Sequence, residues 1–229
     1  MSSSGDGTAA QRITWFEARA AGVATALAGR SVSVECADRA SWRVLATKHG
    51  FARETTWAMT PLHWDSARGQ PEAGSRAILA PRACVLASSF AAMPTEQGSR
   101  LCWHRGGARP VLGECDAWAA KLTAVHVLSH ESMHLAGAVD EASAECLAMQ
   151  LDAFVAIRLG ADGLFARRMA HEYWTLYHPE QDRAYQSREC REGGALDLFP
   201  DRRGWPSPRR YPGNISRLLV SFVADLPTT

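Results

Sequence analysis

The most regular pattern of apolar positions in the chain lies between residues 114 and 136. This stretch contains no proline or glycine, and its apolar side chains recur at three- and four-residue steps, as on one face of a helix. The stripe consists of Trp118, Leu122, Val125, Leu128 and Leu135, with Ser132 at the step between the last two. Gly137 follows, and glycine is favoured there because the residue that ends a helix often adopts a left-handed backbone conformation. The pattern therefore predicts a helix from Glu114 to Ala136 with one buried face.

A second helix is predicted directly after the first. Asp140 is a favourable N-cap, the residues from Glu141 to Leu159 suit a helix, and Gly160 ends it. Only residues 137–139 connect the two helices. Because so short a connection brings consecutive helices back alongside each other, we expect an antiparallel hairpin.

The remaining pattern predicts further helices and a small sheet in the amino-terminal part. Helices are expected at Thr14 to Leu27, Ser41 to Lys48, from near Pro81, about Gly163 to Tyr177, and Ile215 to Val223. Strands are expected at Val32 to Cys36, near Trp57 to Leu62, and at Ala77 to Leu79. Residues 193–213 are rich in proline and glycine and predict irregular structure. The fold class is thus α+β, with helices dominating.

Length and composition indicate one globular domain. The chain has 229 residues, 46% of them hydrophobic and 21% charged, which is ordinary for a protein with a packed core. Residues 1–11 are rich in serine and glycine and predict a disordered segment, so the domain is expected to span 12–229. A net charge of +1 gives no electrostatic basis for a nucleic-acid partner.

The sequence contains no evident targeting or membrane segment. Its only candidate apolar stretch near the amino terminus, residues 20–28, is too short for a secretory signal, and no run approaches a membrane span. The six cysteines are scattered without a C-x-x-C pair, which excludes a zinc ribbon. Reduced thiols and a cytoplasmic location are therefore the default expectation, with export by another route left open.

The candidate chemistry lies within the first predicted helix. His130, Glu131 and His134 form the pattern H-E-x-x-H. Two histidines four residues apart lie on one helix face, so both imidazoles can reach one metal ion. The glutamate points to the neighbouring face, where it can activate water without binding the metal. The sequence therefore predicts one zinc ion per chain, held by His130 and His134, with Glu131 as the general base.

The third zinc ligand is expected on the second helix. The metal should lie near the level of Ser132, and on the returning helix the same height falls on Glu145. Glu141 lies one turn nearer the bend, where it is better placed to orient a ligand, and Asp140 is a third candidate. We rank Glu145 over Glu141 over Asp140.

This arrangement resembles the zincin metallopeptidases. Two motif histidines followed by a glutamate on the next helix are similar to the gluzincin ligand set, and the continuation from Asp140 to Ala148 resembles uncharacterised bacterial zincin-like proteins with a short hairpin. The resemblance implies hydrolysis of peptide bonds in a peptide or protein substrate. It also implies a sheet edge beside the motif helix that binds extended substrate, with Ala77 to Leu79 as our first choice.

A rival resemblance lies within the same clan. H-E-x-x-H followed by Gly137 and Asp140 is similar to small secreted bacterial proteases that resemble metzincins, in which Asp140 would be the ligand. Metzincins also carry a methionine turn beneath the metal. Met149 lies in mid-helix and Met169 in another predicted helix, which weakens this interpretation.

Other roles stay open for residues around the motif. An oxyanion needs a further donor, and His171, Tyr173, Tyr177 and His178 are candidates on the helix after the hairpin, although packing against the core is their simpler role. His126 extends the histidine stripe and is expected to be a hydrogen-bonded side chain. Were His126 a fourth ligand, the zinc would be structural, and a zincin-fold binding domain without turnover is the other alternative to an enzyme.

Overall fold

The computed structural model describes residues 9–61, 63–65, 70–72, 74–92 and 114–226. Seven α-helices of this part are α1 (Ala9–Ala28), α2 (Arg39–His49), α3 (Pro81–Ala92), α4 (Glu114–Ala136), α5 (Glu141–Arg158), α6 (Gly163–Glu172) and α7 (Ile215–Ala224). Its strands are β1 (Ser33–Cys36), β2 (Ala58–Met59), β3 (His63–Asp65), β4 (Gln70–Glu72) and β5 (Arg76–Leu79). Short turns of helix follow α6, namely η1 (Tyr173–Tyr177), η2 (His178–Glu180) and η3 (Arg183–Tyr185). The predicted α+β class with dominant helices is confirmed.

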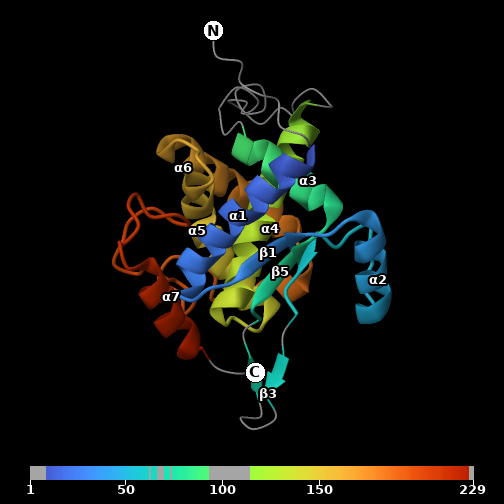
Figure 1. Cartoon of the computed structure of the whole chain (residues 1–229). Helices are drawn as coiled ribbons and strands as arrows, with labels where there is room; N and C mark the ends of the chain where they lie inside the picture. Colours follow the sequence, from blue (N-terminus) through green and yellow to red (C-terminus); the bar gives the residue numbers. More distant parts are fainter. Residues whose placement is uncertain (1–8, 62, 66–69, 73, 93–113, 227–229) are drawn as a thin grey trace.

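Helix α4 lies at the centre of the molecule (Figure 1). It contacts α1, α3 and α5 as well as strands β2 and β5. Trp118, Leu122, Val125 and Leu128 are buried, as the apolar stripe predicts. Helix α4 and the helices and strands that contact it therefore form one packed unit around the H-E-x-x-H segment.

The predicted hairpin of α4 and α5 is confirmed. Asp140 caps α5 by accepting a hydrogen bond from the Ser143 amide at 2.8 Å. The two helices approach closely through small side chains. The Ser129 hydroxyl donates a hydrogen bond to the Ala148 carbonyl at 2.9 Å. A second contact joins His126 to Asp152, so residues earlier in α4 face residues later in α5. The two helices are therefore antiparallel.

The three-stranded sheet has the order β1-β5-β2. Strand β1 runs parallel to β5 and pairs Val34 with Ala77, whereas β2 runs antiparallel and pairs Ala58 with Leu79. Strand β5 is thus hydrogen-bonded on both sides, and its residues Ala77, Ile78 and Leu79 are buried. The expectation that Ala77 to Leu79 forms a substrate-binding edge is wrong, because this strand is central. Strand β2 lies at the edge beside α4.

Several predicted boundaries need correction. Helix α1 begins at Ala9, so the helix takes in residues 9–11, which were assigned to a disordered segment; residues 1–8 lie outside the described part. Helix α2 begins two residues earlier than expected because Asp38 caps it through the Ser41 amide. Beyond Glu172, the predicted single helix changes to a π-helical turn.

Disulfide bonds join Cys36 to Cys84 and Cys146 to Cys190. The first ties β1 to α3, and the second ties α5 to the segment before residue 193. The expectation of reduced thiols is wrong for these four cysteines, because the sequence separations of 48 and 44 residues hid the pairing. Among the described helices, none has the length and apolar content to cross a membrane.

Candidate metal centre

Three ring and carboxylate atoms converge where α4 meets the start of α5. The Nε2 atoms of His130 and His134 lie 3.1 Å apart. Glu141 Oε2 lies 2.9 Å from His130 Nε2 and 3.4 Å from His134 Nε2. Both histidines are buried, while the Glu141 side chain is 48% exposed. The set therefore opens toward solvent on the Glu141 side.

The spacing of these atoms fits a zinc ion. Bonds of about 2.0–2.1 Å in a tetrahedral site place neighbouring donor atoms about 3.3 Å apart, close to all three distances here. The other ring nitrogens are anchored: His134 Nδ1 lies 2.7 Å from the Ala138 carbonyl, and His130 Nδ1 lies 3.0 Å from Glu145 Oε2. Such anchors hold Nδ1 as the protonated nitrogen and direct Nε2 to a metal.

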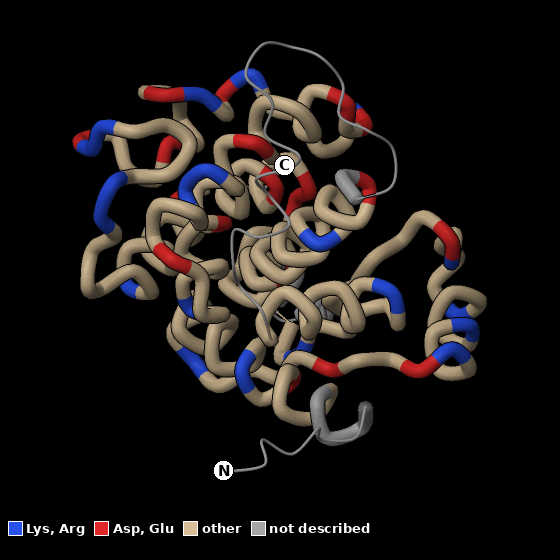
Figure 2. The backbone as a smooth tube through the Cα atoms, turned by 90° about the horizontal axis from the view of Figure 1, so that it is seen from above, with Lys and Arg blue, Asp and Glu red and all other residues tan. Residues whose placement is uncertain are grey.

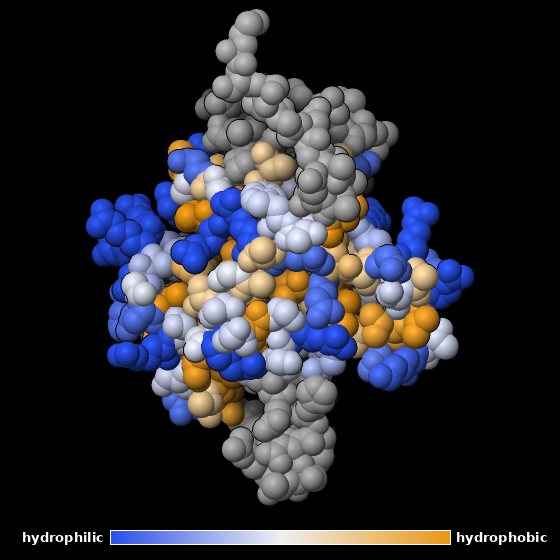
Figure 3. All heavy atoms as spheres, viewed as in Figure 1, coloured by the Kyte–Doolittle hydropathy of each residue, from blue (hydrophilic) through white to orange (hydrophobic). Residues whose placement is uncertain are grey.

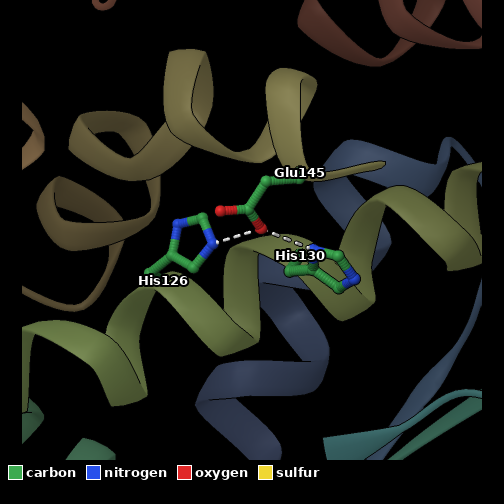
Figure 4. Close-up of side chains that lie close together, drawn as sticks. All are labelled: His126, His130 and Glu145. Carbon is green, nitrogen blue, oxygen red and sulfur yellow. Dashed lines mark hydrogen bonds and ion pairs between the residues drawn. The ribbon is translucent and has the colours of Figure 1, made fainter. Parts of the chain in front are cut away.

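Glu145 lies on the opposite side of the His130 ring from Glu141. Its Oε2 atom is 2.8 Å from His126 Nε2 and 3.0 Å from His130 Nδ1, and both rings point at the carboxylate from α4 (Figure 4). Glu145 was predicted to face both motif histidines, but it contacts His126 and His130 instead. Glu141 occupies the position between the motif histidines.

A buried hydrogen-bonded chain continues from Glu145 into the core. His126 contacts Glu145 through Nε2 and Asp152 Oδ2 through Nδ1, at 2.8 and 3.0 Å. Because both partners are carboxylates, both ring nitrogens carry protons. The expectation that His126 is a hydrogen-bonded histidine is confirmed. Tyr173 extends the chain, since its hydroxyl donates to Glu145 Oε1 at 3.4 Å and its ring stacks on His126 at 3.7 Å.

The charges of this cluster shift its pKa values strongly. Burial lowers the pKa of His126, but the charges of Glu145 and Asp152 outweigh this effect. The pKa therefore rises from 6.5 to about 10. For His130, burial likewise lowers the pKa, and hydrogen bonds to Glu141 and Glu145 raise it to about 9. Hydrogen bonds from His130 and His134 hold the pKa of Glu141 well below its usual range. A metal at His130 must therefore displace a firmly held proton.

Glu131 borders the cavity beside these groups. The cavity has a volume of about 650 Å³ and is called the metal cleft here. Its lining includes His130, Glu131, His134 and Glu141 on one side and residues 55–60 on the other. The Thr60 hydroxyl donates to Glu131 Oε2 at 2.6 Å. Within the described residues, no hydrogen bond is found for Oε1.

Three of the four predicted oxyanion donors lie away from the metal cleft. His171 is exposed on α6, Tyr177 packs on Tyr173 with ring centroids 5.8 Å apart, and His178 is buried with Nδ1 3.8 Å from Glu145 Oε1. None of these three lines the cleft in the described part of the chain, whereas the fourth candidate, Tyr173, does line it. Tyr185 lines it as well, with its ring 5.8 Å from that of His130.

Sequence analysis missed both Tyr185 and Thr60. Tyr185 reaches the cleft through the short turns η2 and η3, and Thr60 through the loop after β2. Neither lies in a periodic pattern, so their positions depend on tertiary packing. Burial and the charge of Glu141 raise the pKa of Tyr185, which keeps its hydroxyl protonated as a donor.

Comparison with protein-family models, with curated proteins and with solved structures finds no match for this chain. The assignment of a function therefore depends on the geometry of the site.

Proposed function

We propose that the protein is a zinc-dependent hydrolase, and specifically a metallopeptidase of the zincin type. The observation that carries the proposal is the convergence of His130 Nε2, His134 Nε2 and Glu141 Oε2 within 3.4 Å of one another. Three protein ligands leave a fourth position open, as in catalytic rather than structural zinc sites. We infer that Glu141 is the third ligand and that Glu145 orients His130.

The chain's own residues supply the acid–base chemistry. When bound, zinc lowers the pKa of water to about 7 and polarises a carbonyl oxygen. Glu131 Oε1 then accepts the proton of the attacking water and passes it to the leaving nitrogen, while Thr60 holds Oε2. The Tyr185 hydroxyl donates to the developing oxyanion.

Strand β2 supports the choice of a peptide as substrate. It forms the edge of the sheet and lines the metal cleft through Ala58 and Met59. An extended peptide can add to such an edge by main-chain hydrogen bonds, which places its carbonyl groups along the cleft.

A purely structural zinc site is the alternative, and it would require His126 as a fourth ligand. His126 contacts Glu145 on the Nδ1 side of the His130 ring, whereas His134 and Glu141 lie on the Nε2 side. Both nitrogens of His126 are already bonded to carboxylates. This contact pattern favours an open site over a closed one.

A comparison of the wild-type protein with Glu131→Gln tests the proposal. Both proteins should contain one zinc per chain, and the variant should hydrolyse a mixed peptide library about 10²–10⁴-fold more slowly, because an amide cannot accept the proton. The exposed Glu192→Gln variant is the matched control and should keep full activity. Zinc is measured by metal analysis and cleavage by mass spectrometry.

Two outcomes would contradict the proposal. Chelator-sensitive hydrolysis that survives Glu131→Gln unchanged would exclude this glutamate as the base. Zinc-loaded, folded wild-type protein that cleaves no peptide in the library would favour the binding-domain alternative.

A further inference from the structure

A second and larger cavity adjoins the metal cleft. It has a volume of about 940 Å³ and is called the arginine groove here. Its lining includes four arginines and two tryptophans: Arg39, Arg43, Arg53, Arg82, Trp42 and Trp57. Thr56 and Trp57 line both cavities, so the two are adjacent.

The two cavities follow one face of α4. Asp116, Ala117 and Ala120 line the arginine groove, and Thr123, Val127, His130 and Glu131 line the metal cleft, at three- and four-residue steps. At 1.5 Å per residue, the distance from residues 117–120 to Glu131 is about 16–21 Å. An extended peptide covers this distance with about five or six residues.

The opposite wall is formed by the segment that leads into the edge strand. Residues 56 and 57 line the arginine groove, and residues 58–60 continue into the metal cleft. A peptide that pairs with β2 is therefore directed into the arginine groove by the same stretch of chain. Pairing fixes the path of the substrate backbone but leaves either chain direction available.

The arginine groove carries unbalanced positive charge. Four arginines face two acidic residues, Glu54 and Asp116, which leaves a net charge of +2. Arg53 is paired with Glu54 at 3.6 Å. Within the described residues, Arg39, Arg43 and Arg82 have no carboxylate within ion-pair distance, although Arg82 lies 4.9 Å above the Trp57 ring. Figure 2 marks positions of lysine or arginine along α2 at the right, and Figure 3 shows hydrophilic side chains beside hydrophobic ones on the same part of the molecule.

We propose that the arginine groove binds an acidic segment of the peptide substrate, about five or six residues from the bond that is cleaved. The proposal rests on the proposed function, because it assigns the groove to the same substrate that reaches the metal cleft. Guanidinium groups suit carboxylates because their paired N–H groups match two carboxylate oxygens. A peptide fits better than a nucleic acid, because the groove leads to a strand edge and the whole chain carries a net charge of only +1.

Binding to the full chain without turnover provides the test. Zinc-loaded Glu131→Gln protein is titrated into fluorescein-labelled twelve-residue peptides that share a neutral segment and carry four glutamates or four glutamines at one end. The glutamates are placed at the amino end in one pair of peptides and at the carboxyl end in another. In one of these two pairs, the acidic peptide should bind about tenfold more tightly than its neutral counterpart. Added salt should reduce this preference.

The triple variant Arg39→Gln/Arg43→Gln/Arg82→Gln should lose the preference. Its matched control, Arg209→Gln/Arg210→Gln/Arg217→Gln, removes three exposed arginines outside the groove and should retain it. Circular dichroism and zinc content verify that both variants keep the fold. Equal binding of acidic and neutral peptides at both ends, or equal loss in both triple variants, would overturn the proposal. Tighter binding of an oligonucleotide with four phosphates would also overturn it.

The result separates this proposal from the proposed function. Hydrolysis without any charge preference would sink the groove assignment and leave the metallopeptidase in place. A groove-dependent preference in a protein that cleaves nothing would support the groove and count against the enzyme.

Discussion

At the scale of single residues, Glu141 and Glu145 differ in burial rather than in chemistry. The Glu141 side chain is 48% exposed and touches the two motif histidines, whereas that of Glu145 is 3% exposed and touches His130 and His126. A ligand at a cleft must meet solvent and substrate, while an orienting group works best when buried. The two glutamates are therefore separable by experiment.

We predict that Glu141→Gln weakens zinc binding more than Glu145→Gln does. Loss of an orienting carboxylate costs about 10–100-fold in metal affinity, and loss of a ligand should exceed this range. In the presence of chelator, the order of the two effects on protein stability should be the opposite. Glu145→Gln leaves the buried His126 imidazolium poorly paired and should cost about 3–5 kcal/mol of unfolding free energy, against about 1 kcal/mol or less for Glu141→Gln.

Competition with a zinc indicator measures the first quantity, and urea denaturation in chelator measures the second. Retention of zinc by Glu141→Gln together with its loss from Glu145→Gln would restore the order predicted from the sequence.

The sequence identified His130, Glu131 and His134 because their spacing alone places them on adjoining helix faces. It ranked Glu145 first because helix height was the only coordinate available. Rotation about the helix axis decides the matter: Glu141 and Glu145 lie one turn apart, and each contacts a different nitrogen of the same imidazole. Tyr185 and Thr60 lay beyond prediction, since no local pattern marks a side chain that packing alone brings to the cleft.

At the scale of elements, the start of α5 holds both a helix cap and the proposed zinc ligand in consecutive residues. The Asp140 side chain accepts a hydrogen bond from the Ser143 amide, so Asp140 serves as the helix cap. The same role is filled on α6 by Asp162, which accepts the Leu164 amide at 2.8 Å. Asp162 therefore offers a matched comparison outside the metal centre.

Asp140→Ala and Asp162→Ala should each lower the unfolding free energy by about 0.5–2 kcal/mol, because each leaves amide groups of a first turn without a partner. Both proteins should still bind one zinc per chain. Thermal or urea denaturation gives the stability, and metal analysis gives the stoichiometry. Zinc lost from Asp140→Ala alone would favour the metzincin-like ligand set.

Helices were easier to predict than strands for a physical reason. Helix α4 carries a long periodic stripe with a glycine at its end, and its predicted bounds are those observed. Strand β2 has only two residues, and the pairing of β5 on both sides depends on segments about 20 to 40 residues away. Which strand lies at an edge is decided by those distant partners.

At the scale of the whole molecule, two disulfides link segments that are distant in sequence. Because such bonds persist in oxidising compartments, we propose that the protein functions in one. Peptide mapping without reduction should recover Cys36 linked to Cys84 and Cys146 linked to Cys190.

Replacing Cys146 and Cys190 together by serine should lower the unfolding free energy by about 2–4 kcal/mol, since a loop of this length loses less entropy on folding when it is already closed. Urea denaturation of oxidised protein measures the loss. Wild-type protein treated with a reductant is the control and should be destabilised at least as much. Free thiols at these four positions in native protein would contradict the pairing.

The compactness of the metal centre along the chain has a consequence for folding. His130 and Glu141 are separated by 11 positions, and the outermost bonded pair within the α4–α5 hairpin, His126 and Asp152, by 26. Closing so short a loop costs little entropy, and contacts of low sequence separation form early. The hairpin can therefore bring the proposed zinc ligands together before the sheet is complete, and the proposed zinc ion would act as a template for folding as well as a reagent.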